Sequence, residues 1–187
     1  PYAHGAIAYV AEQHLTPKAK AECRRYLKHT LPYHASWMDH WRAVPPFVPT
    51  NNWHGFSANA NGDVDWEKGE GKAMGQLHKI MEEMGNGKYK NLPDSLVRHH
   101  LLILVHSLPD MHCPVHVGFS RKDFPEYRYS LRNKGKTYKM HGFWDASPAF
   151  TRKGWSYEKY TSVVDNVTPK QAKKIIKKGN FGYWGRD

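Results

Sequence analysis

Cysteine is scarce in this chain, and no long apolar segment is present. Only Cys23 and Cys113 occur among the 187 residues, and neither has a second cysteine at C-x-x-C spacing. A zinc site would therefore have to rely on histidine and carboxylate ligands. The two cysteines are compatible with one disulfide or with two free thiols. No apolar run reaches the roughly 18 residues that a membrane-spanning helix needs, which excludes a transmembrane segment.

Acidic side chains are fewer than basic ones, and the difference is unevenly distributed along the chain. The chain has 28 Lys and Arg against 17 Asp and Glu, a formal charge of +11. Residues 1–120 are almost balanced, with 12 basic and 11 acidic side chains, whereas residues 121–187 carry 16 and 6. A basic second part favours polyanions such as nucleic acid or phosphorylated surfaces. A solvated basic surface explains the charge equally well.

Internal repeats and low-complexity segments are absent, so length is the best guide to domain number. A chain of 187 residues predicts one domain, residues 1–187, large enough for a hydrophobic core. The sequence starts at Pro1 without an initiator methionine or a signal peptide, and it stops soon after a helix-like segment. We therefore expect a processed or trimmed form with incomplete termini.

Apolar residues recur at helical spacing along most of the chain, which predicts a mostly α-helical fold. The expected helices cover residues 4–15, the segment after Thr16-Pro17, and residues 33–44, 66–84, 157–165 and 169–178. A further helix is expected to begin at Pro93-Asp94-Ser95 and to lead into the motif around His106, where Pro109 and Pro114 kink or end it. A loop rich in Pro, Asn and Gly is expected at residues 45–65, with a turn at residues 86–91. The stretch RYSLRNKGKTYKM predicts one short hairpin that turns at Asn133-Lys134-Gly135.

The thirteen histidines include a group spaced for metal binding. In LVHSLPDMHCPVHVG, His106 and Asp110 lie four residues apart, on one helical face, and His116 follows six residues later. His141 and Asp145 in KMHGFWD repeat the spacing of four. Imidazoles and carboxylates that converge in this way suit zinc, and aspartates can be shared between ions.

Three more candidates lie earlier in the chain. His4 falls in the first turn of the first expected helix, Asp39 lies between Trp37 and Trp41, and His54 lies in the long loop. Long loops without regular structure are often functional. Each of these residues alone is equally explained as a hydrogen-bonded structural side chain.

Five motifs together resemble the zinc-dependent single-strand nucleases of the S1/P1 type, whose fold is shared by zinc phospholipase C. They are AHGAIAYVA, SWMDHWR, NNWHGF, LVHSLPDMHCPVHVG and KMHGFWD, and they occur in the family's order over residues 4–145. The resemblance implies a single-domain, mostly helical fold with three zinc ions in a cleft.

Carried over residue by residue, the resemblance implies three ligand sets. The first is Asp39, His54, His106 and Asp110; the second is His116, His141 and Asp145; the third is His4 and Asp110, which bridges two ions. In the family an N-terminal Trp also chelates the third ion. That position falls two residues before Pro1, so either this sequence has lost its first residues or the third site is incomplete.

The implied activity is hydrolysis of single-stranded DNA or RNA to products with 5′-phosphates, with 3′-nucleotides as further substrates. The implied chemistry is attack by a hydroxide generated on zinc. Asp110 is an expected catalytic residue because it would hold two of the zinc ions. Arg42, three residues after Asp39, matches the family's phosphate-contacting position and is the second expected catalytic residue. The resemblance also implies a secreted, periplasmic or cell-envelope protein.

Two departures from the family pattern bear on activity. The family has a carboxylate three residues after the loop histidine, where this chain has Ser57; Asp63 or Asp65 would have to reach back from the same loop. The family's glycine-rich segment after the His116 position is replaced by FSRKDFPEYRYS. Base preference therefore does not transfer.

Two alternative functions follow from the same residues. The first is a phospholipase C-like hydrolase of phospholipid head groups, although those relatives tend to have Glu where this chain has Asp145. The second is a zinc-stabilised protein that binds polyanions with a steep salt dependence and little or no turnover.

Overall fold

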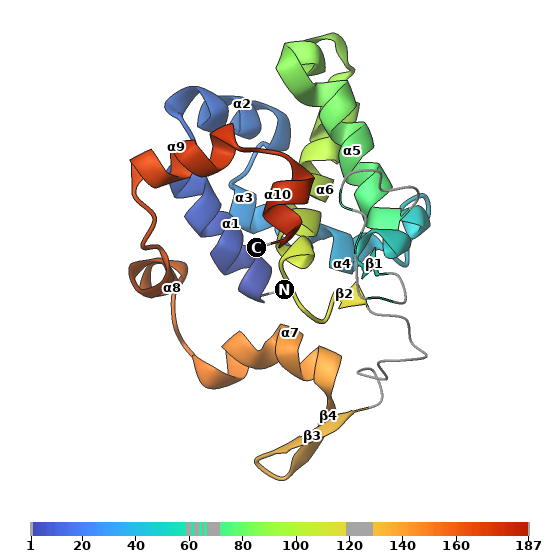
Figure 1. Ribbon diagram of the computed structural model, residues 1–187, viewed down its shortest axis with the longest axis vertical. Helices are drawn as coiled ribbons and strands as arrows, with labels where there is room; N and C mark the ends of the chain where they lie inside the picture. The colour runs from blue at the N-terminus through green and yellow to red at the C-terminus, as the bar shows by residue number, and fades with distance from the viewer. Residues whose placement is uncertain are drawn as a thin grey trace.

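The computed structural model describes residues 2–58, 61, 64, 66, 72–118 and 129–186, and helices dominate this part of the chain (Figure 1). The mostly α fold class predicted from the sequence is confirmed. The α-helices are α1 (Tyr2–His14), α2 (Pro17–Leu27), α3 (Leu31–His34), α4 (Trp37–Trp41), α5 (Lys72–Met84), α6 (Asp94–Met111), α7 (Met140–Thr151), α8 (Tyr157–Val164), α9 (Pro169–Lys177) and α10 (Phe181–Arg186).

Short 3-10 helices and strands complete the described structure. The 3-10 helices are η1 (Val48–Trp53) and η2 (Gly85–Asn91), and the strands are β1 (Phe56–Ser57), β2 (Val117–Gly118), β3 (Ser130–Asn133) and β4 (Lys136–Lys139). Among the described residues, none of the helices is both long enough and apolar enough to cross a membrane.

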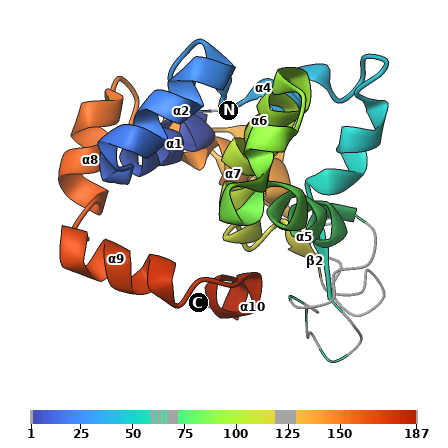
Figure 2. The same ribbon diagram turned by 90° about the horizontal axis from the view of Figure 1, so that it is seen from above.

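Helix α6 is the centre of the fold, and it packs against α1, α2, α3, α4 and α5 (Figures 1 and 2). Its side chains enter three separate core clusters. Leu102 packs with residues of α1 and α3, Ile103 packs with Met38 and Ile80, and Met111 packs in the cluster around Leu77. Because α6 is fixed on several sides, side chains at its C-terminal end have well-defined positions.

Threonine caps start α2 and α9, as the sequence predicts. The Thr16 hydroxyl accepts a hydrogen bond from the Ala19 amide, with Pro17 in the first turn. Thr168 and Gln171 form a reciprocal capping box at the start of α9. Each cap satisfies amide groups that a helix N-terminus leaves without partners.

The prediction of a single helix over residues 33–44 is wrong. The structure has two short helices, α3 and α4, interrupted at Ala35 and Ser36. The interruption leaves the Ala35 carbonyl to accept a hydrogen bond from His106, 2.7 Å away, in place of an amide of its own helix. The hydrogen bond between Ala35 and His106, which are 71 residues apart in the sequence, therefore overrides local helix propensity.

Residues 45–65 were expected to form a loop without regular structure, and this expectation is only partly correct. They contain η1 and β1, and β1 pairs in parallel with β2, with Phe56 opposite Val117 and Ser57 opposite Gly118. Asp63 and Asp65 lie outside the described residues, so their proposed reach toward the site stays a prediction. Residues 119–128, which hold most of the segment FSRKDFPEYRYS, also lie outside them.

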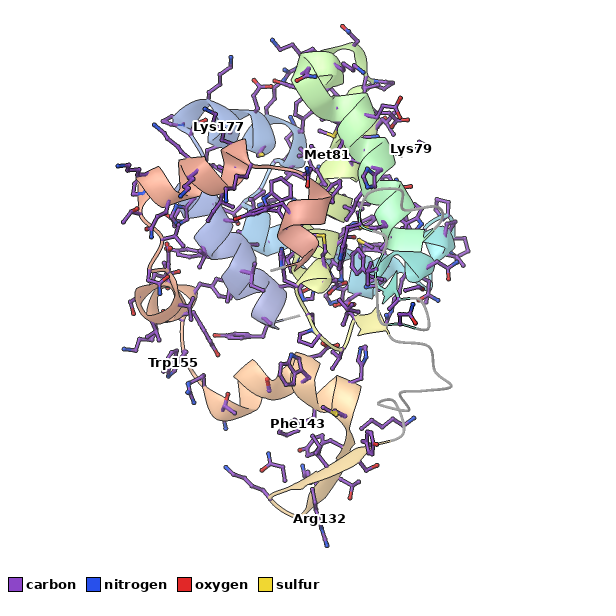
Figure 3. The ribbon with its side chains drawn as sticks, in the orientation of Figure 1. Lys79, Met81, Arg132, Phe143, Trp155 and Lys177 are labelled. Carbon is purple, nitrogen blue, oxygen red and sulfur yellow. The ribbon has the colours of Figure 1, made fainter. Side chains whose placement is uncertain are left out.

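The predicted hairpin is present as β3 and β4, and it projects away from the helices (Figure 1). Both residues of its two-residue turn, Lys134 and Gly135, have positive φ angles of 47° and 78°, as a type I′ turn requires. Strand β4 leads directly into α7, where Phe143 faces the hairpin and its ring lies 5.6 Å from that of Tyr138 (Figure 3). The hairpin and α7 therefore form one unit.

A core substitution in α6 tests the central role of this helix. Ile103 is fully buried, one turn before His106, so Ile103→Ala leaves a cavity at the junction of three helices. We expect the free energy of unfolding to fall by about 2–5 kcal/mol, measured by urea denaturation. Ile176→Ala is the matched control: Ile176 is 65% exposed, and its loss is expected to cost less than about 0.5 kcal/mol. Equal effects of the two substitutions would contradict this account.

Candidate metal centre

His106 and Asp110 lie one turn apart at the C-terminal end of α6, and both are fully buried. The Nδ1–H of His106 donates to the Ala35 carbonyl, which leaves Nε2 as the free ring nitrogen. This Nε2 lies 3.3 Å from Asp110 Oδ2. A backbone carbonyl therefore fixes both the orientation and the tautomer of the imidazole.

Asp39 and His54 approach the same point from α4 and from the residue after η1. His54 Nδ1 lies 3.1 Å from His106 Nε2 and 3.4 Å from Asp110 Oδ2. Asp39 Oδ1 lies 3.8 Å from both ring nitrogens. We call Asp39, His54, His106 and Asp110 the Asp39 group.

His116 is placed by the short parallel sheet. The Phe56 amide donates to the His116 carbonyl, and the His116 Nδ1–H donates to the His54 carbonyl at 2.7 Å. This arrangement turns His116 Nε2 toward Asp145, whose Oδ1 lies 3.3 Å away. The two-residue strands therefore hold two candidate ligands, His54 and His116, in a fixed relation.

His141 and Asp145 come from one face of α7. Their side chains meet, with His141 Nε2 3.2 Å from Asp145 Oδ2. The His141 ring also stacks on that of His116, with ring centroids 4.8 Å apart. We call His116, His141 and Asp145 the Asp145 group.

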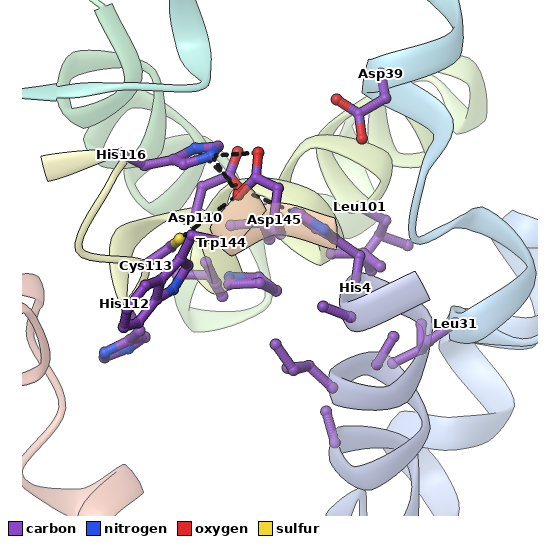
Figure 4. Close-up of a pocket in the computed structure, with 18 of the residues that line it drawn as sticks. His4, Leu31, Asp39, Leu101, Asp110, His112, Cys113, His116, Trp144 and Asp145 are labelled. Carbon is purple, nitrogen blue, oxygen red and sulfur yellow. Dashed lines mark hydrogen bonds and ion pairs between the residues drawn. The ribbon is translucent and has the colours of Figure 1, made fainter. Parts of the chain in front are cut away.

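His4 completes the arrangement from the first turn of α1. Its Nε2 lies 2.9 Å from Asp110 Oδ1, and its ring stacks on that of His106 with centroids 4.1 Å apart. All eight side chains predicted as metal ligands therefore lie in one connected cluster around Asp110. Figure 4 shows His4, Asp39, Asp110, His116 and Asp145 of this cluster. Their roles as ligands stay a prediction.

The arrangement of the candidate ligand atoms suits a bound cation better than it suits hydrogen bonds among these side chains. With its Nδ1–H held by the Ala35 carbonyl, His106 turns its other ring nitrogen, Nε2, toward Asp110 Oδ2. Within the described part of the chain, the buried Asp110 Oδ2 has no hydrogen-bond partner. A buried carboxylate oxygen without such a partner is costly, and a cation bound at this point would satisfy it.

The spacing of the donor atoms agrees with this fit. Two ligand atoms bound tetrahedrally at about 2.0–2.1 Å from zinc lie about 3.3 Å apart. The His106–Asp110, His116–Asp145 and His141–Asp145 separations are 3.3, 3.3 and 3.2 Å. The mixed imidazole and carboxylate donor set is also one that zinc accepts.

Asp110 is charged despite its burial. Burial alone would raise the pKa of its carboxyl, but the surrounding imidazoles hold that pKa well below its usual range. These are the rings of His106, His116, His4 and His54. A permanent buried negative charge of this kind is a strong attractor for a cation.

His116 and Asp145 form a second charged pair. Burial would lower the pKa of His116, but Asp110 and Asp145 raise it to about 11. Burial would likewise raise the pKa of Asp145, and the rings of His116 and His141 hold it below its usual range. Binding of a metal by this pair would therefore release a proton.

Cys113 is a further residue of this centre to which the sequence assigned no role. Its sulfur, His116 and Asp145 offer ligand atoms that all lie within 4.8 Å of one another. Cys23 and Cys113 are both free thiols, which decides against the disulfide. The only sequence signal was the position of Cys113 midway between Asp110 and His116. Its neighbour His112 is exposed and points away from the cluster (Figure 4).

A cavity of about 910 Å³ opens beside the cluster, between α1 and α6. Side chains of both ligand groups border it at one end, and Trp144 adjoins them. The other walls are mostly apolar, with Ile7 and Ala11 from α1 and Leu101 and Leu108 from α6. The volume lies within the range of small-molecule sites in proteins.

Arg42 lies at the C-terminal end of α4, one turn after Asp39. The exposed Arg42 and the half-exposed Asp39 lie on the same side of this helix because residues three apart are neighbours on a helix surface. Arg42 is therefore a near neighbour of Asp39 and is open to solvent.

The chain matches the S1/P1 nuclease family over residues 2–181. It therefore belongs to the S1/P1 nuclease family, a class of nucleases that are zinc-dependent in general. A search of curated proteins finds no match to this chain.

The electrostatic coupling between Asp110 and His116 is directly testable. In metal-free protein, Asp110→Asn removes the charge whose hydrogen bond contributes most to the raised pKa of His116. We expect that pKa to fall clearly below about 11, as measured by NMR titration of the histidine ring. Asp165→Asn is the matched control, because Asp165, directly after α8, pairs with His14 at the C-terminal end of α1, away from the cluster. An unchanged His116 titration in Asp110→Asn would refute the coupling.

Proposed function

We propose that this chain is a zinc-dependent nuclease that hydrolyses single-stranded DNA or RNA to products with 5′-phosphates and also accepts 3′-nucleotides. The observation that carries the proposal is one connected cluster of eight candidate ligands, in which the imidazoles of His4, His54, His106 and His116 surround the buried Asp110 carboxylate. Family membership supports the nuclease class, and the ligand cluster supports the metal dependence.

Each part of the cluster has a defined task in this proposal. Asp110 joins the two ligand groups, and carbonyls of Ala35 and His54 keep the rings of His106 and His116 directed inward. When bound, zinc would lower the pKa of water toward about 7 and offset the charge of the phosphate. Arg42 would contact the phosphate through its planar, permanently charged guanidinium.

Trp144 gives the site a surface for a nucleobase. It is 47% exposed, borders the cavity, and directly precedes Asp145. Unpaired bases stack on aromatic side chains with little sequence preference, at about 1–3 kcal/mol per base. This contact suits a single-stranded substrate, whose bases are free to leave the stack.

We further propose that residues 1–187 form one domain and that the protein acts outside the cytoplasm, in the secreted, periplasmic or cell-envelope compartment. Members of the family are generally secreted. The excess of basic residues after position 120 would attract a polyanionic substrate to this domain.

Metal removal is the first test of the proposal. We expect a chelator to abolish hydrolysis of single-stranded DNA and added zinc to restore it. Asp110→Asn, which alters the shared ligand, is expected to lower kcat by more than about 100-fold and to reduce the zinc content. Asp165→Asn serves as the control with unchanged activity. Chelator-resistant hydrolysis would rule out the zinc mechanism, and salt-dependent binding without any turnover would indicate a binding protein instead.

Arg42 has its own test, because its expected role concerns the phosphate and not the metal. Arg42→Ala is expected to lower kcat/KM by about 10- to 100-fold, the range of one hydrogen bond to a charged group. Zinc content should be unchanged. Arg42→Lys should recover part of the loss, since it keeps the charge but not the planar two-donor contact. A loss of zinc in Arg42→Ala would place this residue in the metal site.

The apolar walls of the cavity favour a second candidate, a hydrolase of phospholipid head groups. The side chains of α1 and α6 that line the cavity would accept an acyl chain next to the metal cluster. Release of phosphocholine from phosphatidylcholine vesicles, compared with digestion of single-stranded DNA under the same conditions, separates the two candidates. Preferential release of phosphocholine would replace the nuclease proposal.

A further inference from the structure

The turn after α6 brings Cys113 to the Asp145 group. The Cys113 amide donates to the Asp110 carbonyl at 3.1 Å, and the His116 amide donates to the Cys113 carbonyl at 2.9 Å. Two successive hydrogen-bonded turns therefore link Asp110 to Cys113 and Cys113 to His116. Their side chains point to a common side, as Figure 4 shows.

The position of the sulfur resembles that of a ligand. Cys113 Sγ lies 3.8 Å from Asp145 Oδ1, the oxygen that also faces His116 Nε2 at 3.3 Å. A sulfur about 2.3 Å and an oxygen about 2.0 Å from a tetrahedral zinc would be about 3.5 Å apart. The ligand atoms of Cys113, His116 and Asp145 all lie within 4.8 Å of one another, close enough to bind one ion.

We propose that Cys113 is a fourth protein ligand, through its thiolate, of the metal that His116, His141 and Asp145 would hold. The inference rests on the proposed metal centre and extends it. On metal binding the S–H bond of Cys113 breaks, a sulfur–metal bond forms, and the proton passes to solvent. No oxidant or reductant takes part.

A thiolate changes what this site does. Two imidazoles, one carboxylate and one thiolate fill a tetrahedral site, and filled sites of this kind serve structure, whereas catalytic sites keep an open position. The sulfur also favours zinc, cobalt and cadmium over magnesium and manganese. The Asp145 group would therefore hold its metal tightly, and the Asp39 group with His4 would carry the open positions.

Cobalt substitution tests the proposal, because Co²⁺ occupies nitrogen, oxygen and sulfur sites like those of zinc and absorbs light. The probe is Co²⁺ added to the metal-free full chain. A sulfur-to-cobalt charge-transfer band in the near ultraviolet reports a thiolate ligand, and the weaker visible bands report cobalt bound in any protein site. We expect both in the unsubstituted protein and in Cys23→Ser, where Cys113 is the only remaining cysteine.

Cys113→Ser is the informative variant and Cys23→Ser its matched control, because Cys23 belongs to none of the ligand groups found among the described residues. In Cys113→Ser we expect the charge-transfer band to vanish, the visible bands to remain, and one zinc to bind at least about tenfold more weakly. If this variant does not fold, the spectrum of Cys23→Ser still decides.

The outcomes distinguish a failure of Cys113 as a ligand from a failure of the whole metal centre. Visible cobalt bands without a charge-transfer band in Cys23→Ser overturn the Cys113 ligand and leave the metal centre intact. A charge-transfer band that persists in Cys113→Ser also overturns it. A chain that binds no cobalt and no zinc at all overturns both this inference and the proposed function.

Discussion

The buried carboxylate of Asp110 is the interaction on which the rest of the site depends. A charge removed from water is costly unless partners surround it, and Asp110 is 1% exposed with four imidazoles close to its two oxygens. Those rings come from α1, the loop after η1, α6 and the turn before β2. One side chain thus brings three other segments of the chain to the C-terminal end of α6.

Backbone carbonyls then decide which way the rings face. Ala35 and His54 each accept an Nδ1–H, from His106 and His116 respectively, so both Nε2 atoms are directed to carboxylates. Two irregular features of the fold serve these contacts. The gap between α3 and α4 makes the Ala35 carbonyl available, and the two-residue sheet of β1 and β2 brings the His54 carbonyl to His116.

The sequence predicted features that depend on short spacings and missed those that depend on distant partners. Pairs four residues apart, such as His106 with Asp110, lie on one face whatever the surroundings, and the hairpin turn at Lys134-Gly135 is similarly local. The break at Ala35 was missed because its cause is His106, and β1 was missed because two residues show no periodicity. Cys113 was missed because only the packing of α7 brings Asp145 to it.

The two ligand groups differ in the negative charge that they would bring to a bound metal. Every anionic ligand cancels part of the charge of a bound metal, and so leaves less to polarise water or a phosphate. Asp110 shares its charge between the Asp39 group and His4, whereas Asp145 acts with one group only. A thiolate from Cys113 would bring the Asp145 group to electrical neutrality with a divalent ion. With such a thiolate, charge would favour anchoring of a metal in the Asp145 group and attraction of the phosphate to metals held by the Asp39 group and His4.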